Sequence, residues 1–73
     1  MKELIGKRVT IFCAVYIYTG KLVDVTDKYV KLEAASIVYE TGGFDEPDWR
    51  DAQRLPNNWY VATNIIESFG ILK

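Results

Sequence analysis

The chain has 73 residues, and its nine basic and ten acidic residues give a formal net charge of −1. This length fits a single domain, residues 1–73, which buries only about 60% of its unfolded surface and therefore has a small core. The single cysteine excludes an intrachain disulfide, and the absence of histidine excludes the usual zinc sites. We therefore expect no cofactor, and oligomerisation is the stabilising device that remains.

The composition also bears on location and chemistry. No apolar run approaches the roughly 20 residues of a membrane span. The first residues, MKELIGKR, lack the apolar core of a secretory signal, so we expect a cytoplasmic protein that does not enter a membrane. Cys13 has no evident base to activate it, and we expect the chain not to be an enzyme.

The first extended segments follow a short N-terminal turn. Residues 2–6 are predicted to form one helical turn that ends at Gly6. Apolar residues alternate over 9–13, and the alternation changes phase before Tyr16, which indicates a tight turn near residues 14–15. One long strand with a bulge is the alternative, because no glycine, asparagine or aspartate marks this turn. Cys13 is expected to be a small buried hydrophobic residue.

Gly20 lies inside the second extended segment, which precedes a polar turn at residues 26–28. A glycine within a strand marks a bend or bulge of the kind that turns the corner of a small barrel. A third strand is predicted to begin at Tyr29 and to continue to residue 41, where two glycines end it.

Residues 42–58 are predicted to be a long loop. An aspartate followed two residues later by a proline resembles a helix start, so residues 48–55 are predicted to form two helical turns. Four carboxylates and two arginines give the loop a net charge of −2, and their spacing favours a solvated acidic loop over a calcium site. Trp49 and Trp59 are expected to cover the mouth of the barrel, to pack in a subunit contact or to stack on a ligand.

Residues 59–63 and 65–69 are predicted to be the fourth and fifth strands, joined by a tight connection at Asn64. Five short strands, one of them bent at a glycine, favour an all-β fold. The expected architecture is a strongly bent antiparallel sheet that forms a small barrel of SH3-like or OB-like type. The pattern does not fix the connections that distinguish these two.

Residues 18–32 resemble the first signature motif of the Sm-like superfamily, which includes the bacterial host-factor RNA chaperone. In that family a hydrophobic-x-Gly-x-hydrophobic stretch precedes an Asp-x-aromatic-hydrophobic-x-hydrophobic stretch. Here the first part is YTGKL around Gly20, and the second is DKYVKL, which begins at Asp27. The spacing from Gly20 to Asp27 is one residue longer than the family usually shows.

Residues 61–66, VATNII, are similar to the second family motif, in which hydrophobic-Arg-Gly-Asn precedes an isoleucine. Ala62 and Thr63 replace the arginine and the glycine. The resemblance implies a five-stranded SH3-like barrel and a homo-oligomeric ring, in which the fourth strand of one subunit pairs with the fifth strand of the next. Such a ring covers otherwise unpaired strand edges. Its interface is expected to contain Val61, Ile65, Ile66 and Phe69.

The resemblance also implies a site for single-stranded RNA that contains Tyr29, Lys31, Thr63 and Asn64. Tyr29 takes the position of the aromatic ring that stacks on a base, although it can equally pack at the start of a strand. Lys31 replaces a base-reading asparagine and can contact a phosphate or a base carbonyl. Asn64 keeps a donor and an acceptor, but asparagine is also common in turns. Asp27 is expected to cap its turn through hydrogen bonds to backbone amides.

Two functions remain open from the sequence. The first is a ring that binds single-stranded RNA, as an RNA chaperone or a scaffold of a ribonucleoprotein. The second is a non-enzymatic assembly module in which Trp49 and the 42–58 loop contact a protein partner. The acidic pI of about 5.2 and the missing Arg-Gly pair favour the second function.

Overall fold

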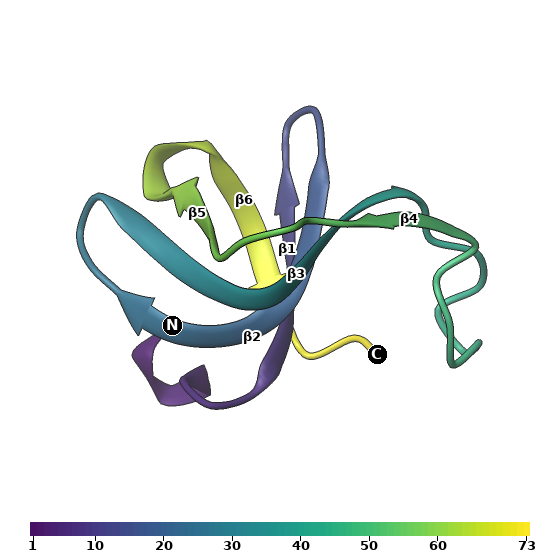
Figure 1. The fold of residues 1–73 in the computed structure, drawn as a ribbon, viewed down its shortest axis with the longest axis horizontal. Coiled ribbons are helices and arrows are strands. Elements are labelled where there is room, and N and C mark those ends of the chain that lie inside the picture. Colours follow the sequence, from purple (N-terminus) through teal and green to yellow (C-terminus); the bar gives the residue numbers. More distant parts are fainter.

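The protein is a small, strongly bent antiparallel sheet, as Figure 1 shows for a computed structural model that covers residues 1–73. It contains no α-helix, and its two 3₁₀ helices have three residues each. In chain order the elements are η1 (Lys2–Leu4), β1 (Arg8–Cys13), β2 (Ile17–Val25), β3 (Tyr29–Glu40), β4 (Asp51–Arg54), β5 (Trp59–Ala62), η2 (Thr63–Ile65) and β6 (Ile66–Gly70). The all-β class is confirmed, as are the turns near residues 14–15 and 26–28.

The sheet has six strands, and the prediction of five is wrong. The additional strand is β4, which lies where the sequence predicts helical turns over residues 48–55. β3 is 12 residues long, and the backbone of its second half pairs with β4 from Ser36 opposite Arg54 to Glu40 opposite Asp51. All four residues of β4 are exposed, so its backbone pairing with β3 overrides the local helix signal. The segment 42–58 is therefore not one continuous loop.

The strand order is β4-β3-β2-β1-β6, and β5 pairs with the first half of β3. β4, β5 and β6 each pair with one neighbour only, which leaves the sheet open with unpaired backbone on three strands. In Figure 1, β2 and β3 curve across the molecule, and the segment between β3 and β4 projects from one side.

Gly20 lies at the bend of β2, as predicted. The pairing of β2 with β3 shifts there, because Thr19 is opposite Ser36 whereas Lys21 is opposite Glu33. The extra residue belongs to β3, where Ala34 has a positive φ of 48°. A Cβ atom on Gly20 would lie 3.0 Å from the carbonyl oxygen of Glu33, so only glycine lets the two backbones approach this closely.

The core is small and is formed by β1, β2, β3 and β5. Its buried apolar cluster consists of Val9, Ile11, Leu22, Val30, Leu32, Ala35 and Val61. Thr19 is buried, and its hydroxyl donates a hydrogen bond to the carbonyl of Val9 at 2.9 Å. Cys13, expected to be buried, is half-buried at the border of this cluster. The structure holds no helix that is long and apolar enough to cross a membrane.

Candidate nucleic-acid interface

Two tyrosines and a lysine share the outer face of the β3–β5 pair. Val30 on β3 and Val61 on β5 point into the core, where Val30 is fully buried and Val61 is 3% exposed. Because side chains alternate along a strand, their neighbours Tyr29, Lys31 and Tyr60 point to the opposite face. We call these three residues the tyrosine face.

The side chains of the tyrosine face contact one another. The Tyr29 and Tyr60 rings meet edge to face, with centroids 5.2 Å apart and an interplanar angle of 78°. The Lys31 ammonium lies 5.7 Å from the centroid of Tyr60, within cation–π range. Tyr29 is 36% exposed and Tyr60 is 54% exposed, so both rings retain surface for a ligand. The arrangement offers aromatic surface for a base and a positive charge for a phosphate.

The turn before β3 fixes the position of Tyr29. The hydroxyl of Thr26 accepts hydrogen bonds from the N–H groups of Lys28 at 3.2 Å and Tyr29 at 3.0 Å. It is also placed to donate to the carbonyl of Tyr29 at 3.1 Å. The sequence assigns this capping to Asp27, but the structure gives it to the neighbouring threonine. Threonine performs this role in turns just as aspartate does, so residue type alone does not separate the two.

Thr63 connects this turn to the end of β5. Its hydroxyl donates to the carbonyl of Asp27 at 2.7 Å, and its N–H donates to the carbonyl of Lys28 at 2.9 Å. Asn64 is the next residue in η2, where it is exposed and its side chain makes no hydrogen bond. Thr63 therefore has a structural role, whereas the amide of Asn64 is available to a ligand.

Tyr60 is the member of the tyrosine face that sequence reasoning did not assign to the site. The stretch that resembles the second family motif begins at Val61, one position after Tyr60. The strand register is the signal that identifies it, because Tyr60 lies directly opposite Lys31. Residues opposite each other in an antiparallel pair have neighbouring side chains on the same face.

The residues expected at a subunit interface differ in accessibility. Ile65 is 48% exposed and Phe69 is 43% exposed, whereas Ile66 is half-buried. The side chain of Val61 belongs to the core, so only its backbone is free for a subunit contact. β5 and β6 each have one unpaired edge, to which a further strand can be added.

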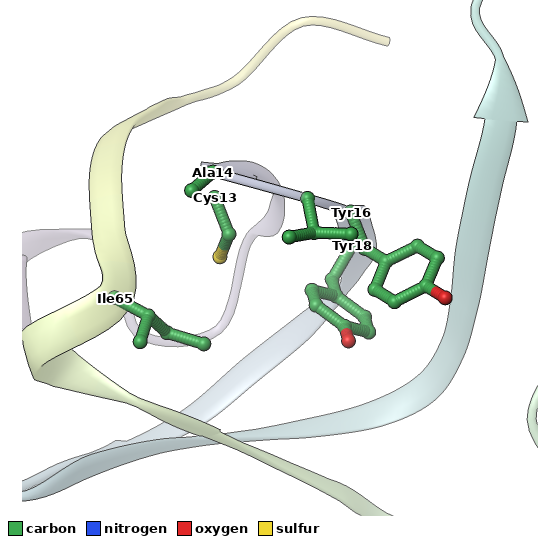
Figure 2. A pocket seen from close by; sticks show the side chains of 6 residues that line it. Cys13, Ala14, Tyr16, Tyr18 and Ile65 are labelled. Atoms are coloured by element: carbon green, nitrogen blue, oxygen red, sulfur yellow. The ribbon is translucent and has the colours of Figure 1, made fainter.

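An apolar cavity of about 110 Å³ lies between the β1–β2 turn and η2. Figure 2 shows Ile65 on one side of it and Cys13, Tyr16 and Tyr18 on the other. The Tyr16 and Tyr18 rings meet at an angle of 64° with centroids 6.4 Å apart. Burial, reinforced by the charge of Glu67, raises the pKa of the Cys13 thiol, and burial likewise raises the pKa of Tyr18. Both groups are thus kept neutral, which suits an apolar contact rather than nucleophilic chemistry.

The charged side chains are dispersed over the surface. No group of three or more histidine, cysteine, aspartate or glutamate side chains lies close enough to hold a metal ion. The ion pairs are few: the N-terminal ammonium with Glu3 at 3.4 Å, and Arg50 with Glu46 at 3.7 Å. The acidic residues near Glu46 therefore form a solvated surface. The carboxylate of Glu46 itself accepts a hydrogen bond from the N–H of Gly43 and so orders the segment.

No family model matches this chain, and no curated protein matches its sequence with significance. The features that bear on function are therefore the tyrosine face, the turn that positions it and the unpaired edges of the sheet.

Proposed function

We propose that the chain is an Sm-like protein that assembles into a ring and binds single-stranded RNA. The architecture supports this when β4 is treated as an addition within residues 42–58. The remaining strands, β1, β2, β3, β5 and β6, then form a five-stranded bent sheet with a tight connection at η2. The short η1 stands where the family has a longer helix.

The observation that carries the RNA proposal is the tyrosine face. Its central member by sequence motif, Tyr29, is held by the Thr26 turn and has a second ring, Tyr60, beside it. A base that stacks on exposed aromatic surface gains roughly 1–3 kcal/mol. Lys31 supplies a positive charge next to the rings, whereas the chain as a whole has a net charge of −1 and does not attract RNA. Binding then depends on stacking more than on overall electrostatic attraction.

The test is fluorescence anisotropy with labelled oligouridine and oligoadenylate at low salt. Replacing Tyr29 or Tyr60 with leucine removes the ring while keeping apolar bulk, and is expected to weaken binding roughly 5- to 150-fold. Tyr39→Leu is the matched control, because Tyr39 is a comparably exposed tyrosine at the other end of β3. The proposal is refuted if the assembled protein binds neither oligonucleotide. It is also refuted if variants that lack the Tyr29 or Tyr60 ring bind the oligonucleotides as tightly as the parent chain does.

The ring proposal rests on the unpaired edges of β5 and β6, which η2 joins directly. Pairing β5 of one copy with β6 of the next uses one edge from each and can close head to tail. Native mass spectrometry should then give a single oligomer. Ile65→Asp is expected to dissociate it, whereas Ile5→Asp, at a similarly exposed isoleucine near η1, is expected to leave it intact. A monomer at micromolar concentration contradicts the ring.

A second candidate function is protein assembly through the segment between β3 and β4. Phe44, in this segment, is 58% exposed, and an exposed aromatic ring is a common contact residue. Deleting residues 44–56 would also remove β4, so Phe44→Ser is the sharper variant. It should abolish capture of a protein partner and leave oligouridine binding unchanged; loss of both activities together would instead indicate that the segment maintains the fold.

A further inference from the structure

Lys73 reaches back from the segment after β6 to the connection between β3 and β4. Its ammonium nitrogen donates to the main-chain carbonyl oxygens of Thr41 and Gly43, each at 2.9 Å, and of Asp48 at 3.0 Å. The same nitrogen lies 4.7 Å from the ring centroid of Trp49. Between 25 and 32 residues separate Lys73 from its three acceptors, so these are tertiary contacts.

The contacts match the chemistry of a primary ammonium group. Such a group has three N–H bonds, and here there are three carbonyl acceptors for them. The indole ring of Trp49 adds a cation–π attraction. Lys73 makes no ion pair with a carboxylate. Directed neutral acceptors and an aromatic ring thus hold the cation, and a quaternary ammonium without N–H bonds cannot make the same contacts.

The acceptors are held in place by contacts within their own segment. Gly42 has a positive φ of 69°, which favours glycine and lets the carbonyls of Thr41 and Gly43 face one ligand. The carboxylate of Glu46 accepts a hydrogen bond from the N–H of Gly43, and the N–H of Glu46 donates to the carbonyl of Gly43 at 3.1 Å. Arg50 lies 3.7 Å from the same carboxylate. The segment is therefore partly preorganised for its ligand.

We infer that residues 41–49 form a binding site for one primary ammonium group, and that Lys73 of the same chain occupies it. Occupancy fastens this projecting segment to the segment after β6. Phe44 from the first and Ile71 and Leu72 from the second line a cavity of about 180 Å³ against β1 and β6. Loss of the ammonium therefore releases one wall of that cavity.

The test is chemical rescue with a small amine. Trp59→Phe leaves Trp49 as the only tryptophan and hence the only indole reporter. In that background Lys73→Ala removes the ammonium, which should change the emission of Trp49. Exchange of the hydrogen-bonded amides of Gly43 and Glu46 should accelerate on the order of ten-fold, because hydrogen bonds to a charged group and a cation–π contact are lost together. Lys21→Ala is the control, since Lys21 is exposed and its side chain makes no contact of these kinds.

n-Propylammonium chloride should then restore the parent emission of the Lys73→Ala protein in a saturable manner. Tetramethylammonium chloride and sodium chloride at the same ionic strength should not. Unchanged emission and exchange in Lys73→Ala would overturn the inference, because Lys73 would then not order the segment. Restoration by all three salts, or by none, would also overturn it, since neither result requires a site that recognises N–H bonds.

Discussion

Replacing Gly20 with alanine is the sharpest test of the bent sheet. The added Cβ would lie 3.0 Å from the carbonyl oxygen of Glu33, 3.1 Å from Cα of Ala35 and 3.2 Å from Cβ of Leu32, whereas ordinary contacts begin at 3.4 Å. Two of these atoms belong to the backbone of β3, so the strands must separate by a few tenths of an ångström. Overpacking of this kind costs about 1–3 kcal/mol.

Alanine also lowers the conformational entropy of the unfolded chain relative to glycine, which offsets about 0.4–1 kcal/mol of this cost. We therefore expect Gly20→Ala to lower the free energy of unfolding by about 1–2 kcal/mol. A domain of this size has a total of only roughly 4–11 kcal/mol. The melting temperature should fall by roughly 5–15 °C. Urea unfolding followed by circular dichroism, at one fixed protein concentration, measures the change.

Gly70→Ala is the matched control for Gly20→Ala. It also adds a methyl group to a strand glycine, but no atom lies within 4 Å of the new Cβ and its φ is not positive. Its stability should equal or slightly exceed that of the parent chain. Should Gly20→Ala prove as stable as Gly70→Ala, the close approach of β2 and β3 would not be what requires glycine at the bend.

Three further changes test single interactions. Thr10→Val should raise the free energy of unfolding by about 1 kcal/mol, because the Thr10 hydroxyl is buried without a hydrogen-bond partner. Thr19→Val should lower the free energy of unfolding by about 1 kcal/mol, because it removes the hydrogen bond to the Val9 carbonyl. Equal effects of the two substitutions in urea unfolding would contradict this. Burial raises the pKa of the Cys13 thiol. Alkylation of Cys13 by iodoacetamide should therefore reach half its maximal rate at a higher pH in the folded chain than in the urea-unfolded chain. Coincident pH–rate profiles of the two states would show that the thiol is not desolvated. Lys31→Met should reduce the salt dependence of oligouridine binding by about one phosphate contact, and an unchanged slope would exclude Lys31 from the RNA site.

Much of the sheet could be predicted because its signals are local. Alternating apolar residues identified β1, β2, β3, β5 and β6, and Gly20 marked the bend through its missing side chain. β4 could not be found in this way, because its four exposed residues, DAQR, have no apolar face. β4 pairs with the second half of β3, whose backbone β5 leaves free. Whether β4 can form therefore depends on how far β3 extends past the part that pairs with β5. That is a tertiary property without a local signal.

The candidate site was predictable in part for the same reason. The motif resemblance located Tyr29 and Lys31, and the structure brings them together with Tyr60, which only the register of β5 identifies. Thr26 and Asp27 are both turn-forming residues, so the sequence did not decide which of them caps the turn. The contacts of Lys73 were not foreseen, because its acceptors are backbone carbonyls and any residue carries one.

The two cavities of the molecule lie near the two ends of β6, which bears on how the chain completes its small core. One cavity has Ile65 in its wall, just before β6 begins, and the other has Phe69 and Gly70, where β6 ends. Between them runs an unpaired backbone edge. A strand added to this edge would gain main-chain hydrogen bonds along its length and an apolar cavity near each end for its side chains. In the proposed ring that strand is β5 of a second copy, so assembly would cover apolar surface at Ile65 and Phe69 that the single chain leaves exposed.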